Sequence, residues 1–160
     1  MGLTDPPEGA FADPRHPKLG WRLYSKDAEK FNQPINWTKL RVDYVIPEYG
    51  SELTGESYIL EMGFERLNGV DFKKGCYVGQ EVTARMKHKT ELHKGLVKIG
   101  SEQTMVNGEE LFLNDKPIGS VLTVYDRSAL AYVRLKNRDE VLSTKSTKKI
   151  FVDTNPISSN

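Results

Sequence analysis

The chain has 160 residues, of which 38% are hydrophobic and 28% are charged, and its formal net charge is +1. This length allows one ordinary core or two small ones, and the composition is that of a globular protein rather than a disordered one. The charge gives no global field toward nucleic acid or membrane, and no apolar run approaches the roughly 20 residues of a membrane span. The single cysteine excludes an internal disulfide, which favours a reducing compartment, so we predict a cytoplasmic protein.

The first half of the chain has few regular patterns. Four prolines among the first 20 residues predict extended or irregular backbone up to Trp21. A short strand is predicted at residues 20–24, and helical segments at residues 25–33 and 35–46, the second ended by Pro47. The apolar residues at helical spacing in the second segment are Trp37, Leu40, Tyr44 and Val45. A loop-rich stretch follows at residues 47–72.

Beyond His93, short apolar runs alternate with turn residues. Successive strands are predicted at residues 94–100, 109–115, 116–126, 128–136 and 148–153. Asn107-Gly108 and Asn114-Asp115 are the predicted turns. Strands this short and regularly spaced favour a small antiparallel sheet or barrel.

The lone cysteine, Cys76, lies in the stretch KGCYVGQEVTAR, between Gly75 and Gly79. Glycine permits unusual backbone angles and close approach of another group, so these neighbours favour an exposed thiol. If a helix begins at about Gly79, the thiol precedes its N-terminus, where the helix dipole favours an anion. Lys73, Lys74 and Arg85 add positive potential, which would raise the thiolate fraction near neutral pH. The alternative is that Cys76 is a small buried hydrophobe.

The same stretch resembles the signature of the YgfZ family of folate-binding-like proteins, which reads Lys-Gly-Cys, an aromatic residue, any residue, Gly-Gln-Glu and a nearby Arg. The match falls without a gap on Lys74, Gly75, Cys76, Tyr77, Gly79, Gln80, Glu81 and Arg85. The segments DPRHPKLGWRLY, LRVDYVIPEYG, LNGVDFKKG and IGSVLTVYDRSALAYVRL also resemble family segments, in the same order. The resemblance therefore covers about residues 12 to 152.

The family is related to the aminomethyltransferase of the glycine cleavage system, so the resemblance implies an α+β fold that ends in an antiparallel β-barrel. We predict that residues 1–90 form the C-terminal part of an aminomethyltransferase-like folate-binding domain, and that residues 91–160 form the barrel domain. Full family members are considerably longer, and their counterpart of DPRHPKLG follows an N-terminal half with much of the folate pocket. We therefore expect an incomplete tetrahydrofolate site.

In function, the resemblance implies an accessory factor that assembles or repairs iron-sulfur clusters of client enzymes and affects tRNA modification through them. Its implied partners are iron-sulfur assembly proteins or client enzymes. The aminomethyltransferase lacks the Lys-Gly-Cys-aromatic motif, so one-carbon transfer is the weaker alternative and an assembly factor without enzymatic activity is favoured. A tRNA-binding or other nucleic-acid-binding module is a further alternative, but acidic residues dilute the basic runs, and we expect no direct binding.

A stable iron-sulfur cluster is not expected within one chain, because such clusters are held by about four ligands, mostly thiolates, and one cysteine is present. A transient cluster would need ligands from a second chain, a partner or a small thiol. His88 and His93 are interpreted as solvated surface residues. No paired Cys-x-x-Cys or His-Glu-x-x-His spacing occurs, so no metal site is predicted.

The motif residues have separate expected roles. Cys76 is the functional thiol, and Lys74 is the candidate for tuning it. Glu81, in the first helical turn, would favour the helix dipole, and Arg85 is placed either to pair with it at i,i+4 or to reach an anionic ligand. The residues assigned to ligand binding by the resemblance are Gly75, Tyr77, Gly79, Gln80, Glu81 and Arg85. The residues alone leave open whether Gln80 binds a ligand or ties the loop to the barrel, and Tyr77 is expected to pack.

Overall fold

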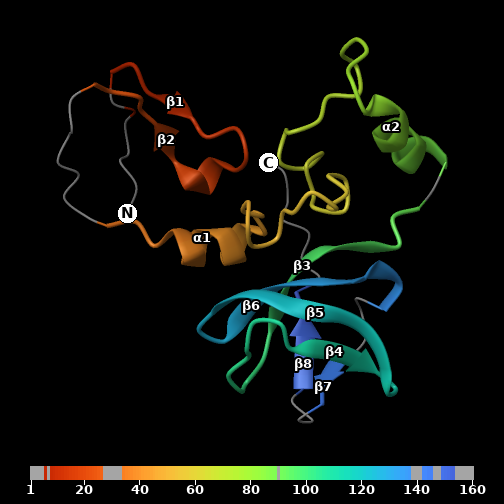
Figure 1. The fold of residues 1–160 in the computed structure, drawn as a ribbon. Coiled ribbons are helices and arrows are strands. Elements are labelled where there is room, and N and C mark those ends of the chain that lie inside the picture. The colour runs from red at the N-terminus through yellow and green to blue at the C-terminus, as the bar shows by residue number, and fades with distance from the viewer. Residues whose placement is uncertain are drawn as a thin grey trace.

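The computed structural model describes residue 6 and residues 8–26, 34–89, 91–137, 142–145 and 149–153. Its elements are β1 (Phe11–Ala12), the 3-10 helix η1 (Pro17–Leu19), β2 (Trp21–Arg22), α1 (Trp37–Tyr44), α2 (Gln80–Lys89), β3 (Lys94–Gly100), β4 (Glu110–Leu113), β5 (Lys116–Tyr125), β6 (Ser128–Arg134), the 3-10 helix η2 (Leu135–Asn137), β7 (Leu142–Thr144) and β8 (Lys149–Val152). Helix α1 lies between the barrel made by β3 to β8 and the hairpin made by β1 and β2 (Figure 1). Helix α2 lies on the side away from the barrel.

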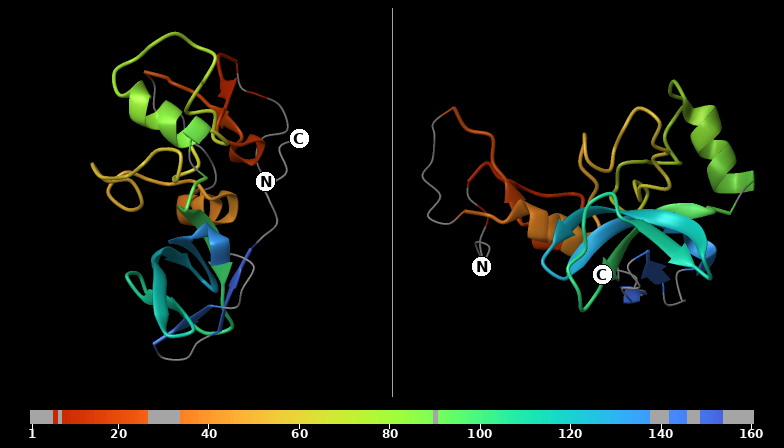
Figure 2. Two further views of the ribbon diagram at one scale, coloured as in Figure 1. Left: turned by 90° about the vertical axis from the view of Figure 1, so that its right-hand side faces the viewer. Right: turned by 60° about the horizontal axis from the view of Figure 1, so that its bottom comes forward.

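The six later strands form a closed antiparallel barrel in the order β3-β6-β5-β4-β7-β8 (Figure 2). This confirms the predicted C-terminal barrel. Strand β6 pairs with β3 along its whole length, from Lys94 opposite Arg134 to Gly100 opposite Ser128. The barrel core consists of buried apolar side chains, namely Ile99, Met105, Leu111, Ile118, Val121, Ala129, Ala131, Val133, Leu142 and Ile150. Several are small, which suits the narrow interior of a six-stranded barrel.

The predicted turns also form. Asn114 and Asp115, between β4 and β5, both have positive φ, at 48° and 62°, as a two-residue type I′ hairpin requires. Gly108 has a φ of 82° in the turn before β4. Strand β7 is absent from the prediction, since three residues are too short to show alternation.

The N-terminal residues are more regular than predicted. Instead of an irregular chain up to Trp21, strands β1 and β2 pair antiparallel, and η1 lies between them. Pro17 does not prevent this, because it occupies the start of η1, where no intrahelical N–H is needed. Gly20, with a φ of 76°, then reverses the chain. We call residues 11–22 the hairpin segment.

Helix α1 lies within the predicted residues 35–46, but it begins two residues later and ends two residues earlier. Asn36 caps its N-terminus by accepting a hydrogen bond from the Lys39 N–H at 2.9 Å. The helix ends because Val45 has left-handed backbone angles, with φ at 52° and ψ at 57°. Its deeply buried residues are Arg41 and Val42 rather than the predicted apolar stripe.

A small core outside the barrel joins the hairpin segment to α1 and the loop after it. Its buried members are Leu19, Ile46 and Leu67. The described residues ahead of the barrel contain few helices, and a partial folate-binding domain is not confirmed. Most of the helix predicted at residues 25–33 lies outside the described residues. Among the helices described, none is both long and apolar enough to cross a bilayer.

Candidate functional site

The thiol of Cys76 lies on an exposed loop, four residues before the first residue of α2. Exposure contradicts the alternative in which Cys76 is a buried hydrophobe. Gly79 has a φ of +84°, a conformation that side-chain-bearing residues rarely adopt, so glycine is required there. Gly75 has no such angle, and a Cβ at this position would meet nothing within 4 Å. Backbone conformation therefore requires glycine at position 79 but not at position 75.

The start of α2 is held by a reciprocal contact between Tyr77 and Gln80. The Tyr77 N–H donates to the Gln80 side-chain oxygen at 3.1 Å, and the Gln80 N–H donates to the Tyr77 carbonyl at 3.2 Å. Gln80 thus ties the thiol loop to α2, whereas the predicted tie was to the barrel. On the next turn, Arg85 donates to Glu81 at 2.6 Å. This is the i,i+4 pair that the spacing predicted.

The thiol loop and the start of α2 carry positive and apolar side chains. The Lys74 ammonium lies 4.8 Å from the centre of the half-buried Tyr77 ring. Lys73 is exposed, and its N–H donates to the Asp71 carboxylate at 2.7 Å. Val78 and Val82 are both exposed, and Val78 is fully so. The loop therefore presents a thiol, cationic groups and apolar surface to solvent on one short segment.

The described residues contain no group of three or more His, Cys, Asp or Glu side chains that could hold a metal ion. His88 is exposed, and its ring packs edge-on against Phe72 with centroids 6.2 Å apart. His93 is also exposed.

A cavity of about 260 Å³ lies between the hairpin segment and α1, away from the motif. Its lining residues are Arg15, Leu19, Arg22, Trp37, Arg41, Ile46 and Glu48. None of the motif residues from Lys74 to Arg85 is among them. The lining combines three guanidinium groups with an aromatic ring, a set suited to a flat or anionic ligand.

Asp13 fixes two of these guanidinium groups. Its buried carboxylate accepts from Arg15 at 3.0 and 2.7 Å and from Arg22 at 2.8 Å. Burial alone raises the pKa of Asp13, but the hydrogen bonds from Arg15 and Arg22 outweigh it and hold that pKa well below its usual range. The wall of the cavity formed by the hairpin segment is therefore charged and held in place.

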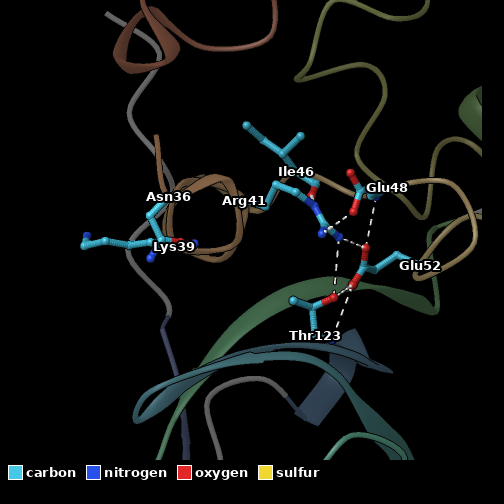
Figure 3. A network of polar contacts seen from close by, with 7 residues as sticks. All are labelled: Asn36, Lys39, Arg41, Ile46, Glu48, Glu52 and Thr123. Carbon is cyan, nitrogen blue, oxygen red and sulfur yellow. Dashed lines mark hydrogen bonds and ion pairs between the residues drawn. The ribbon is translucent and has the colours of Figure 1, made fainter. Parts of the chain in front are cut away.

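Arg41 links the cavity to the barrel (Figure 3). Its guanidinium donates to Glu48 at 2.6 Å, to the Ile46 carbonyl at 3.3 Å and to the Thr123 hydroxyl at 3.4 Å, and it also pairs with Glu52. The Glu52 side chain has no exposed surface. It also accepts from the backbone N–H groups of Glu48 and Thr123. These donors offset the cost of burying the Glu52 carboxylate away from water.

No sequence motif or spacing predicted a site role for Asp13, Arg41 or Glu52. Asp13 and Arg15 stand two positions apart in DPRHPKLG, a segment noted for its resemblance alone. Arg41 lies on a helix in which the predicted apolar stripe consists of other residues. The one available signal was a charged residue, Arg41, placed between apolar neighbours on the helix.

No family model matches the chain. It is similar to the mouse protein named iron-sulfur cluster assembly factor IBA57, mitochondrial, with 37% identity over 98 residues, covering 56% of this chain and 27% of the mouse protein. The human protein of that name is 36% identical over 95 residues, covering 54% of this chain and 27% of its own length. A Neurospora crassa homologue is 47% identical over 98 residues, covering 55% and 22%.

The comparisons confirm the resemblance to the YgfZ family. The aligned region spans about a quarter of the length of these YgfZ-family relatives. These relatives are named as iron-sulfur cluster assembly factors. The binding roles of the motif residues, including Gly75, Tyr77 and Gln80, stay predictions.

The predicted cytoplasmic location is wrong, because these relatives are named as mitochondrial proteins. The prediction rested on a single cysteine and the absence of disulfides. That observation separates secreted proteins from intracellular ones, but it does not separate the cytosol from the interior of an organelle. Import into mitochondria depends on a targeting segment that is independent of the fold.

Proposed function

We propose that this chain acts as an accessory factor in the assembly or repair of protein-bound iron-sulfur clusters. The observation that carries the proposal is an exposed thiol on a loop tied to α2, in a chain similar to named iron-sulfur cluster assembly factors. The Cys76 thiolate is the natural iron ligand in this loop, with its proton released to solvent. Since one thiolate does not complete the coordination of a cluster, the other ligands come from a partner protein or the client enzyme.

The loop also has the features of a protein contact surface. Val78 and Val82, two and six residues after Cys76, offer exposed apolar area, and Lys73 and Lys74 add positive charge. We propose that an iron-sulfur assembly protein or client enzyme binds here. Helix α2 lies away from the barrel (Figure 1), so a partner reaches it without displacing the barrel.

Genetic complementation tests this proposal. Cells lacking their own relative of this chain would receive either the chain or a fusion that restores the full length of the relative, and the activity of an iron-sulfur enzyme would be measured in extracts. The wild-type residue should restore activity and Cys76→Ser should not. Val106→Ser is the matched control, since Val106 is 60% exposed on a loop of the barrel, and it should rescue fully. Full rescue by Cys76→Ser would refute the role of the thiol.

Tetrahydrofolate is a second ligand that we propose, with the cavity beside Trp37 as its site. The flat indole and the guanidinium groups of Arg15 and Arg22 suit a pterin ring and a glutamate carboxylate in kind. The volume of about 260 Å³ lies below the range of about 300–1,000 Å³ for small-molecule sites, so only part of the molecule would be enclosed. We therefore propose weak binding.

Calorimetry with tetrahydrofolate tests this second proposal. Trp37→Ala should remove the binding heat, whereas Trp21→Ala, which changes an exposed tryptophan outside the cavity lining, should leave it unchanged. A low-micromolar dissociation constant in the wild-type chain would contradict the proposal of weak binding. Equal loss of heat in both variants would place the ligand elsewhere.

An effect on tRNA modification is proposed only as a consequence of the first role, through modifying enzymes that carry iron-sulfur clusters. Quantification of modified nucleosides in the complemented cells would show it. Loss of modification should accompany loss of cluster enzyme activity in the Cys76→Ser cells. Modification that falls while iron-sulfur enzymes stay active would contradict this order of events.

A further inference from the structure

His16 connects the hairpin segment to the end of α1 through its imidazole ring. The ring stacks on Tyr44, in the last turn of α1, with centroids 4.1 Å apart and planes inclined by 20°. Its Nδ1 accepts a hydrogen bond from the Lys18 N–H at 3.1 Å and so caps η1. An imidazole nitrogen accepts only when it carries no proton. This arrangement therefore requires neutral His16.

The charges that act on this ring are positive. Arg66, from the loop after α1, donates to the Tyr44 carbonyl at 3.1 Å and to the Val45 carbonyl at 2.6 Å, which places its guanidinium at the same helix end. Lys18 lies two residues along the chain. Burial first, and then the charges of Arg66 and Lys18, lower the pKa of His16 from its ordinary value of 6.5. The third ionisable group against the ring is the Tyr44 phenol.

Protonation of His16 would destabilise this arrangement in two ways. The Nδ1 acceptor for the Lys18 N–H would be lost, and a cation would be placed beside the Arg66 guanidinium. The η1 turn that His16 caps carries Leu19, which belongs both to the small core and to the lining of the cavity. A change at His16 therefore reaches the cavity directly.

The pairing of β1 with β2 in the hairpin segment should survive this change. Asp13 holds Arg15 and Arg22, and its pKa is held well below its usual range, so it stays ionised through mildly acidic pH. The Asp13 N–H also pairs with the Gly20 carbonyl at 2.9 Å. The η1 cap and the contact with α1 weaken, whereas the pairing of β1 with β2 is kept.

We propose that His16 is a pH-sensitive contact that keeps the hairpin segment docked on α1 when neutral and releases it when protonated, which opens the cavity between them. Because the docked ring binds a proton less readily than a free one, docking is complete above about pH 6.5 and is lost progressively as the pH falls below that value. Relative to its value at high pH, the equilibrium constant for release rises by at most a factor of about 1 + 10^(6.5 − pH). This limit is about tenfold at pH 5.5.

Amide hydrogen exchange of the whole chain, followed by NMR at pH 7.5 and 5.5 and corrected for intrinsic exchange rates, tests this proposal without any ligand. Protection of the Lys18 and Leu19 amides should fall by up to about tenfold at pH 5.5. Barrel amides such as that of Ala131 should keep their protection. Unchanged protection of Lys18 and Leu19 in the wild-type chain would overturn the proposal.

Two variants sharpen the experiment. His16→Asn keeps a side-chain oxygen able to cap η1 but does not titrate, so its protection should not depend on pH in this range. A double change of the exposed histidines, His88→Gln with His93→Gln, should behave like the wild type. An equal loss of protection in His16→Asn would overturn the proposal. If that variant is unfolded, the pH titration of the His16 ring protons by NMR in the wild-type chain tests the proposal instead. A titration midpoint at or above pH 6.5 would contradict a docked, neutral ring.

Discussion

Glu52 accepts a hydrogen bond from the backbone N–H of Thr123 in β5, 3.3 Å away, although 71 residues separate the two in sequence. The other carboxylate oxygen of Glu52 pairs with Arg41 of α1. One buried side chain therefore connects the barrel to the helix that lines the cavity. We expect α1 and the barrel to unfold in a single transition, since separating them would break the hydrogen bonds that join Thr123 to Glu52 and Arg41.

Replacing Glu52 by Gln should destabilise the chain by about 1–3 kcal/mol, because it removes the buried one of the two carboxylates that pair with Arg41 and leaves only the more exposed Glu48 as its counter-charge. Urea unfolding, followed by far-UV circular dichroism, measures this loss. Lys39→Met is the matched control. Lys39 pairs with Asp43 on the exposed side of the same helix, so its loss should change stability by no more than about 0.5 kcal/mol. Similar losses in the two variants would show that the Arg41 network contributes little.

Asp13 should make stability depend on pH under acidic conditions. Its pKa is lower in the folded chain than the ordinary 3.8, so the unfolded chain binds more protons. The stability that Asp13 contributes is therefore complete above its unfolded pKa and is lost as the pH falls through about 4 and below. Asp13→Asn should flatten this part of the stability profile. Asp115→Asn, in the exposed turn before β5, should leave the profile unchanged.

The two glycines beside Cys76 should respond differently to alanine. Gly79→Ala forces a Cβ onto a residue with a φ of +84° and should cost roughly 1–2 kcal/mol or shift the start of α2. Gly75→Ala should be nearly neutral for stability, since its φ is ordinary and a Cβ there meets no atom within 4 Å. Thermal unfolding of both variants makes the comparison. An equal cost would mean that the loop has a different backbone in solution.

Cys76 should react readily with a thiol reagent in the native chain, because it is exposed. Labelling with and without denaturant should proceed at rates of the same order, whereas a buried thiol would react only after unfolding. Cys76→Ser should change stability by less than about 0.5 kcal/mol, since an exposed loop atom makes few packing contacts. Protection from the reagent, together with a larger loss of stability, would show that the thiol packs against the protein.

The barrel was predictable because each of its predicted strands and turns is specified by a few neighbouring residues. Runs such as residues 94–100 are short and apolar, and Asn114-Asp115 has the composition of a tight turn, so strand and turn are both visible in a few residues. The start of α2 was predictable for the same reason, from Gly79 and the polar helix after it. Strand β7 was missed because three residues do not define a period.

The buried charges could not be predicted in this way. Asp13 with Arg22 and Glu52 with Arg41 are pairs between separate elements, and no periodicity in the sequence indicates which charges meet. The left-handed Val45 is similar, since a β-branched residue is disfavoured in that conformation and no local signal ends α1 there. These features arise from tertiary packing, which overrides the local preference.

Closure of the barrel limits how other proteins can recognise this chain. Because β8 pairs with β3, the sheet has no terminal strand, and another chain cannot extend it by backbone hydrogen bonding. Within the described residues, the strands outside this closed sheet are β1 and β2, and each is two residues long. Recognition of this molecule should therefore depend on side-chain complementarity. The affinity of a binding partner should therefore change on single substitutions on the surface of this chain. It should not depend on how readily the partner forms a β-strand.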